Sequence, residues 1–235
     1  MTAHTIQSIY TPLDLLLLAF VVVAMPILSA RAGRALAKAR PASLVPRYWG
    51  IIARGLLVSV LVLGDWIWAG RPFPALGLDW PIGFRGRIGF ALAALLACYY
   101  GYALLLGKLT PERREAARKQ LDRLRIVPAT RAEFLLFPLV AFNGGIMEEL
   151  VFRGFLIWMF APFAGLWGAA AVSSLLFGLG HIYQGLFGVA RTAVIGLAFA
   201  AAYVLTGSLW WLMLAHMMIN VFGGLFALRL ERAAA

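Results

Sequence analysis

Acidic residues and cysteine are scarce in this sequence of 235 residues. Only 13% of the residues are charged, with 10 Asp and Glu against 21 Lys and Arg, whereas a soluble domain carries about 25% charged residues. Cys98 is the single cysteine, which excludes an internal disulfide. Hydrophobic residues make up 63% of the chain, and the mean hydropathy is +0.86. These values exclude disorder and most soluble classes, and they predict a polytopic membrane protein. The basic excess suits membrane lipids with anionic headgroups; a nucleic-acid partner is not expected, because little soluble surface remains.

Long apolar runs predict an all-α transmembrane bundle of about seven spans. A bilayer core of about 30 Å needs roughly 20 apolar residues in helical form, and an open sheet would leave backbone groups unsatisfied in lipid. The expected spans are residues 13–30, 50–69, 88–107, 132–160, 166–180, 188–206 and 208–228. The first is not expected to be a signal peptide, because no Lys or Arg precedes it.

Basic residues in the predicted loops indicate an orientation. One loop carries Arg31, Arg34, Lys38, Arg40 and Arg47, and another carries Lys108, Arg113, Arg114, Arg118, Lys119, Arg123, Arg125 and Arg131. Loops rich in Lys and Arg stay in the cytoplasm, so the N-terminus is expected outside and the C-terminus inside. The loop between the second and third spans would then lie outside, although it carries Arg71, Arg85 and Arg87.

The second basic loop separates two predicted regions, residues 1–130 and a core at residues 131–228. Residues 110–125 have the pattern of an amphipathic helix with one basic face, which favours a helix lying on the membrane surface. Thr130 followed by Glu133 is a capping-box pattern, and it predicts the start of the fourth span.

Three ionisable residues interrupt the fourth span, namely Glu148, Glu149 and Arg153. A charge at the centre of a spanning helix costs about 2.5–3.5 kcal/mol, so such residues are functional candidates. Glu149 and Arg153 are four residues apart and can form an ion pair on one helix face. Glu148 points about 100° away and has no partner in its own helix, which makes it a candidate general base. The alternative is that all three only bond neighbouring helices.

Two histidines lie in or at the ends of later spans. His181 follows Phe177 by four residues, so that the aromatic ring can support the imidazole. His216 precedes Asn220 by four residues on one face of the last span. Each histidine alone could be a packing residue; His4, near the N-terminus, is assigned no role.

One carboxylate, two imidazoles and an amide are the groups that activate a water. The carboxylate and imidazoles can deprotonate water directly, or Glu148, His181 and His216 can hold a divalent metal such as Zn²⁺. The amide of Asn220 can donate to a developing oxyanion. A serine nucleophile is not expected, because Ser173 and Ser174 lack a nucleophile elbow and suit close helix packing instead.

These residues resemble the motifs of the CPBP family of intramembrane proteases, also called the CAAX protease or Abi family. The motifs are Glu-Glu-x-x-x-Arg, Phe-x-x-x-His and His-x-x-x-Asn, and they stand here at residues 148–153, 177–181 and 216–220. The resemblance covers the region from about residue 131 to residue 228. It implies a helical membrane fold with a site in a cavity among the core helices.

The resemblance also implies roles and partners. Glu148 and His181 would activate water, His216 and Asn220 would stabilise the oxyanion, and Glu149 and Arg153 would support the site. Both metal-dependent and metal-free mechanisms have been argued for relatives. The substrate would be a membrane-associated peptide or protein, prenylated or bacteriocin-like, and the location a bacterial inner membrane. Bacterial relatives also include immunity and scaffold proteins without known cleavage.

Two other functions remain open on the sequence. A scaffold or bacteriocin-immunity protein could keep the same fold without turnover. A proton-coupled carrier could use the buried acids and histidines as a relay, although no inverted repeat is present.

The depth of the predicted site residues poses a geometric question. In a single helix from Arg131, Glu148 lies about 26 Å along the axis and near the outer face. His181 would lie at the cytoplasmic end of the fifth span. Bringing them together requires tilted helices, a longer fifth span, or a kink near Pro138 or residues 143–145.

Overall fold

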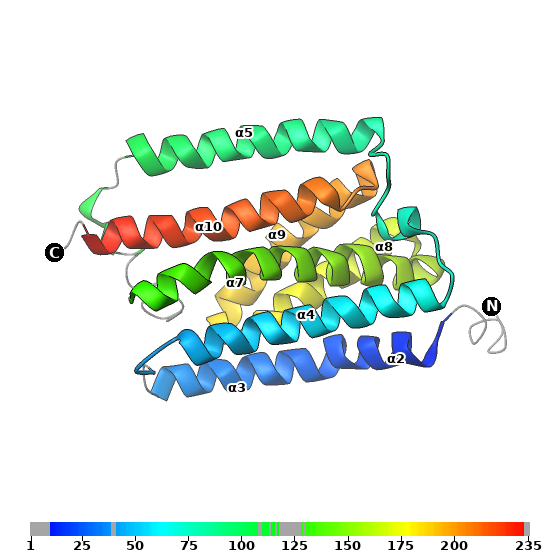
Figure 1. Ribbon diagram of the computed structural model, residues 1–235, viewed down its shortest axis with the longest axis horizontal. Coiled ribbons are helices and arrows are strands. Elements are labelled where there is room, and N and C mark those ends of the chain that lie inside the picture. Colours follow the sequence, from blue (N-terminus) through cyan, green and yellow to red (C-terminus); the bar gives the residue numbers. More distant parts are fainter. Residues whose placement is uncertain are drawn as a thin grey trace.

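The structure, a computed structural model, describes residues 10–38, 41–107, 110–112, 114, 115, 117, 128 and 130–232. Every regular element in these residues is helical, which confirms the predicted all-α class. The elements are α2 (Pro12–Ala19), the π-helix η1 (Phe20–Ala24), α3 (Met25–Lys38), α4 (Val45–Trp68), the 3₁₀ helix η2 (Phe73–Leu76), α5 (Phe84–Leu106), α7 (Arg131–Glu149), the π-helix η3 (Leu150–Phe155), α8 (Leu156–Gly180), the 3₁₀ helix η4 (Ile182–Gln184), α9 (Gly185–Thr206) and α10 (Trp210–Arg232). Figure 1 shows the long helices aligned in one bundle, with α5 at one edge and α2 and α3 at the other.

Six continuous helical stretches in the described residues are long and apolar enough to cross a membrane, against about seven predicted. They are Pro12–Leu36, Val45–Trp68, Phe84–Leu106, Arg131–Gly180, Ile182–Thr206 and Trp210–Leu230. The difference lies in Arg131–Gly180, whose 50 residues contain both the fourth and the fifth predicted spans. Only the non-helical residue Gly165 separates these two spans, so they count as one helical stretch although each is a helix of its own.

The chain reverses its direction within this stretch. Gly165 has φ 66° and ψ 171°, which is outside the helical region and is tolerated because glycine lacks a Cβ. The Ser173 hydroxyl donates to the Phe152 carbonyl, and the rings of Phe152 and Phe177 lie 5.0 Å apart. In a straight helix these two rings would be about 37 Å apart. The second half of α8 therefore packs back against η3.

This reversal answers the question of depth. In an antiparallel pair of helices, the position four residues before Phe152 lies at about the same depth as the position four residues after Phe177. Those positions are Glu148 and His181, so the two predicted site residues come to the same depth without a tilt of the whole helix. The bend comes from Gly165 rather than from Pro138, which lies inside α7.

The start of α7 forms the predicted cap. The Thr130 hydroxyl accepts from the Glu133 amide at 3.3 Å, and the Glu133 carboxylate accepts from the Thr130 amide at 3.2 Å. The other carboxylate oxygen of Glu133 accepts from the Leu44 amide at 2.7 Å. This side chain therefore joins the first turn of α7 to the start of α4. Most of the predicted amphipathic helix at residues 110–125 lies outside the described residues.

The centre of the bundle is the π-helix η3, whose six residues are all buried. Around it, α8 packs on α9, α7 packs on α10 and α4, and α5 packs on α10. Burying every side of one helix is uncommon in a soluble protein of this size. Glu149 and Arg153 lie at the start and in the middle of this buried region, so the site is built into the core.

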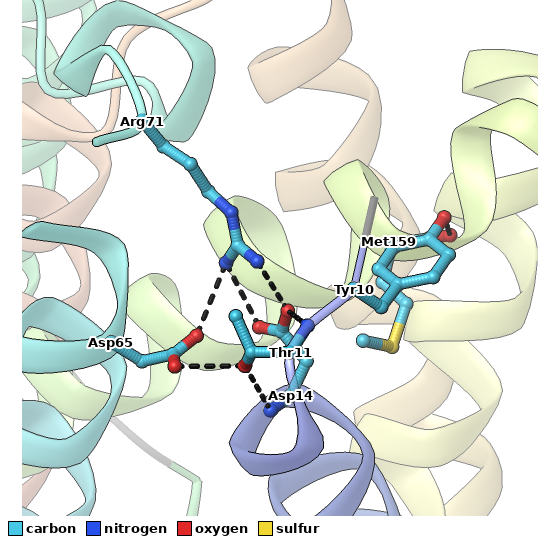
Figure 2. A network of polar contacts seen from close by, with 6 residues as sticks. All are labelled: Tyr10, Thr11, Asp14, Asp65, Arg71 and Met159. Atoms are coloured by element: carbon cyan, nitrogen blue, oxygen red, sulfur yellow. Dashed lines mark hydrogen bonds and ion pairs between the residues drawn. The ribbon is translucent and has the colours of Figure 1, made fainter. Parts of the chain in front are cut away.

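A second buried polar cluster lies where α2 begins and α4 ends. Figure 2 shows the Arg71 guanidinium between the carboxylates of Asp14 and Asp65. It contacts Asp14 through an ion pair and lies 3.2 Å from Asp65, while Asp65 also accepts from the Thr11 hydroxyl at 2.8 Å. The Arg71 Cζ lies 4.4 Å from the centre of the Trp158 ring. Arg71 is thus a structural cation, which accounts for one of the basic residues in the loop predicted to lie outside.

Removing the Arg71 cation should strongly destabilise the protein. Arg71→Ala leaves Asp14 and Asp65, which are 0% and 4% exposed, without their cation. Loss of one partner of a buried ion pair costs about 3–5 kcal/mol. A thermal melt in detergent should therefore show a clear drop in Tm. Arg85→Ala, which removes an exposed cation from the start of α5, should leave Tm nearly unchanged; equal shifts for both variants would contradict a structural role for the cluster.

Candidate active site

The predicted ion pair between Glu149 and Arg153 is present and buried. The Arg153 Nη1 lies 3.0 Å from Glu149 Oε1, and the two residues are 1% and 0% exposed. Arg153 Nη2 also donates to the Gly196 carbonyl of α9 at 3.1 Å. The guanidinium lies over the Phe177 ring, with Cζ 4.5 Å from the ring centre. Arg153 therefore joins α7, α8 and α9 and fixes the position of the Glu149 carboxylate.

The imidazole of His216 lies between the two adjacent acids. Its Nδ1 is 2.6 Å from Glu149 Oε1, and its Nε2 is 3.5 Å from Glu148 Oε2. An ionised carboxylate only accepts hydrogen bonds, so Nδ1 carries the proton donated to Glu149. The Nε2 then faces Glu148. Pairs of this kind set the tautomer and the orientation of a functional histidine.

The Glu149–His216 contact is absent from the sequence prediction, which gives Glu149 only Arg153 as a partner. The contact depends on how closely α7 approaches α10. At Gly145, an added Cβ would lie 2.7 Å from the Met217 Cγ and 2.9 Å from the Met217 backbone nitrogen. Only glycine allows this approach. The sequence signal for this contact is the Gly144-Gly145 pair one turn before the acids. The sequence alone predicts a kink there, whereas in the structure Gly145 allows a close helix contact.

His181 is oriented by its own helix. Its Nδ1 lies 2.8 Å from the Phe177 carbonyl, and its ring lies 4.7 Å from the Phe177 ring, so the predicted support by Phe177 is present. A carbonyl oxygen only accepts, so Nδ1 is the donor and Nε2 is left with a lone pair. His181 ends α8 and lines the cavity described next.

One cavity brings the four predicted catalytic residues together. It has a volume of about 710 Å³, and Glu148, His181, His216 and Asn220 all line it. Its other walls are mostly apolar and come mainly from α3, α4, α7 and α10, with further residues from η4 and α9. Asn220 lies one turn after His216, and its Nδ2 donates to the Ala141 carbonyl at 3.4 Å. This bond is long, so the amide can turn toward a ligand at little cost.

The serines behave as packing residues. Ser173 and Ser174 are both buried, and their hydroxyls donate to the backbone carbonyls of Phe152 and Ala170. No imidazole contacts either hydroxyl in the described part of the chain. Both serines therefore take part in helix packing, the role that their small size predicts.

The metal site predicted at Glu148, His181 and His216 stays a prediction. Among the residues that the structure describes, no three His, Cys, Asp or Glu side chains form a group that could hold a metal ion. The Nδ1 atoms of both histidines are engaged, with the Phe177 carbonyl and with Glu149, which leaves Nε2 of each ring as the atom that could bind a metal. Because the described side chains do not form a complete ligand group, no chemical step is assigned to a metal.

Comparisons with known proteins identify the family of this chain. Residues 130–222 match the family described as type II CAAX prenyl endopeptidase Rce1-like. The chain is 30% identical over 181 residues to an uncharacterized 24.3 kDa protein of Escherichia coli, and the matched region covers 75% of this chain and 78% of that protein. No solved structure gives a significant match. The matched region holds all three motifs and every residue named in the cavity site, and the chain therefore belongs to the CAAX protease family of membrane endopeptidases.

Proposed function

We propose that the protein is an intramembrane endopeptidase in which Glu148 activates a water for attack on a peptide bond. The observation that carries the proposal is the 3.5 Å contact between Glu148 Oε2 and His216 Nε2 in a cavity that His181 and Asn220 also line. A carboxylate beside an oriented imidazole is a common arrangement for general acid–base catalysis.

The reaction can be written with these side chains alone. Glu148, with His181 nearby, removes a proton from water, and the oxygen attacks the carbonyl carbon. The Asn220 amide and a protonated His216 donate to the oxyanion. Glu148 then gives the proton to the leaving nitrogen as the C–N bond breaks. The products are a carboxylic acid and an amine, and one water is consumed.

The second carboxylate has a different task in this proposal. Glu149 is fully buried and accepts from both Arg153 and His216, so it cannot reach a substrate. Its charge favours the protonated form of His216 when the oxyanion develops. Glu149 is therefore a positioning residue, and Glu148 is the catalytic acid–base.

A comparison of membrane proteomes would test this function. Cells producing the wild type or Glu148→Gln at equal levels would be compared for new peptide termini. Termini that depend on Glu148 and lie in or beside membrane spans would support the endopeptidase. A scaffold or immunity protein would instead keep its biological effect in Glu148→Gln and produce no such termini.

We expect cleavage to survive removal of divalent metals, because the proposed base and oxyanion donors are all side chains. The purified protein would be dialysed against a chelator, its metal content measured, and the cleavage rate compared before and after. Loss of activity that stoichiometric Zn²⁺ restores would contradict this expectation and would favour a site at Glu148, His181 and His216.

We further propose that the cavity opens toward the cytoplasm. The end of α3, the start of α4, the start of α7 and the end of α10 lie at one end of the bundle (Figure 1). That end carries the basic residues Arg31, Arg34, Lys38, Arg47, Arg131 and Arg229. The positive-inside rule supports its placement in the cytoplasm, and the opposite end with Arg71 would lie outside.

Cysteine labelling should report this orientation. In a Cys98→Ser background, a cysteine at exposed Ser43 should react with a membrane-impermeant maleimide only after the cells are opened. A cysteine at exposed Ala75, in the loop between α4 and α5, should react in intact cells. The reverse pattern would overturn both the orientation and the cytoplasmic opening.

A further inference from the structure

Three cations line the cavity that holds the proposed catalytic residues. Arg47 and Arg54 come from α4, and Arg191 comes from α9. Glu148 is the one acid among the described lining residues, so the lining carries more positive than negative charge. Arg47 is half-buried, and it forms no ion pair or hydrogen bond with a residue that the structure describes. A partly desolvated cation without an acid leaves a positive potential that attracts an anion.

Tyr183 lines the same cavity as these cations and the catalytic acid. Arg47, Arg191 and Glu148 all lie close enough to act electrostatically on its hydroxyl. Its ring lies 5.9 Å from the His181 ring, and it lines the same cavity. Its backbone is held against α3, where an added Cβ at Gly33 would lie 2.9 Å from the Tyr183 Cα. Tyr183 is therefore firmly placed beside the site.

The hydrogen bonds around Tyr183 determine what its hydroxyl can do. Arg191 Nη2 donates to Gln184 Oε1 at 3.1 Å, which fixes the orientation of the Gln184 amide. Gln184 Nε2 must then be the donor in its 3.0 Å bond to the Tyr183 oxygen. The hydroxyl proton is not used in this chain, and no described residue accepts it. It can be donated to an oxygen of a ligand in the cavity.

We propose that Arg47, Arg191 and the Tyr183 hydroxyl form a subsite that binds a carboxylate of the peptide substrate. This proposal rests on the endopeptidase function proposed above. Two guanidinium groups and one hydroxyl donor suit a carboxylate, whose two oxygens accept several hydrogen bonds. The ligand belongs to the substrate because the subsite shares a cavity with Glu148, and an unrelated anion there would hinder entry of a peptide. The carboxylate would come from an Asp or Glu side chain near the scissile bond or from the chain terminus.

Binding to an inactive variant tests the subsite without requiring cleavage. Glu148→Gln protein in phosphatidylcholine nanodiscs would be titrated with labelled apolar peptides that carry one Asp or one Asn at each position in turn. Each peptide would be made with a free and with an amidated C-terminus. We expect about tenfold tighter binding for peptides with a carboxylate at the favoured position, as for hydrogen bonds to a charged group. The position, or the effect of amidation, identifies which carboxylate is read.

Matched substitutions connect the preference to the subsite. Each substitution would be added to the Glu148→Gln protein. Arg47→Gln removes a charge and Tyr183→Phe removes a single hydrogen-bond donor, and either should reduce the ratio of the affinities for the carboxylate and neutral peptides to about one. Arg34→Gln and Tyr102→Phe make the same chemical changes at exposed positions outside the cavity, and the ratio should persist.

Each remaining result counts for or against the subsite. Equal affinity of the acidic and neutral peptides would overturn it, even if the wild type cleaves both. A preserved preference in Arg47→Gln and Tyr183→Phe would also overturn it. If the protein prefers carboxylate peptides but the wild type cleaves none of them, the subsite is supported and the endopeptidase function is refuted. If Arg47→Gln and Tyr183→Phe change only the effect that added phosphatidylglycerol has on peptide binding, the arginines bind lipid headgroups and the proposal fails.

Discussion

Glu148→Gln is expected to lower the rate of cleavage by about 10²- to 10⁴-fold while the folded yield stays the same. A glutamine cannot take a proton from water, and general acid–base catalysis contributes about that factor. The substitution keeps the shape of the side chain, and Glu148 lies at a partly exposed position in the cavity wall. The rate would be measured on a substrate identified from new peptide termini, with folded yield measured by size-exclusion chromatography.

Glu112→Gln is the matched control for this variant, because it makes the same change at an exposed position outside the cavity. It should cleave at the wild-type rate. Glu149→Gln should instead lower the folded yield, since it weakens the buried contacts to Arg153 and His216. If Glu148→Gln destabilises the protein more than Glu149→Gln does, the roles of the two acids are reversed.

Arg153→Ala should be among the most destabilising substitutions in the chain. It removes the partner of the Glu149 carboxylate and the bond to the Gly196 carbonyl, and it leaves space between two aromatic rings. Breaking a buried ion pair costs about 3–5 kcal/mol because the remaining charge stays buried. We expect a much lower yield of folded protein and a large decrease in Tm in detergent.

A double substitution separates the stranded charge from the loss of volume. Arg153→Met keeps much of the volume, and combining it with Glu149→Gln also removes the unpaired carboxylate. The double variant should be more stable than Arg153→Met alone, as a coupled pair requires. A double variant whose destabilisation equals the sum of the two single effects would show that the ion pair is not the source of the stability.

The composition and the local spacings already predict the membrane class, the helical fold and several contacts. The capping box at Thr130 and Glu133, the pair of Glu149 with Arg153, and the ring contact of Phe177 with His181 each join residues three or four positions apart. Such contacts follow from the pitch of a helix. The apolar runs similarly locate the spans, because length and hydropathy decide whether a helix can cross a bilayer.

The long-range contacts could not be predicted in the same way. His216 meets Glu149 across 67 residues, and Arg71 meets Asp14 across 57 residues. Both contacts depend on which helices become neighbours and on how close their backbones come, as at Gly145. The apolar sequence of α8 likewise gives little sign of where the chain turns back at Gly165. Hydropathy reports burial in lipid, and it does not say which face of a helix meets which neighbour.

Cleavage by the purified protein is the most direct test of the proposed function. Wild type and Glu148→Gln would be reconstituted separately into liposomes with a membrane peptide identified from the new termini. The masses of the products would be measured by mass spectrometry. We expect the wild type alone to give two fragments whose masses sum to that of the peptide plus one water. Equal fragments from both proteins, or an intact peptide with well-folded wild type, would contradict hydrolysis by Glu148.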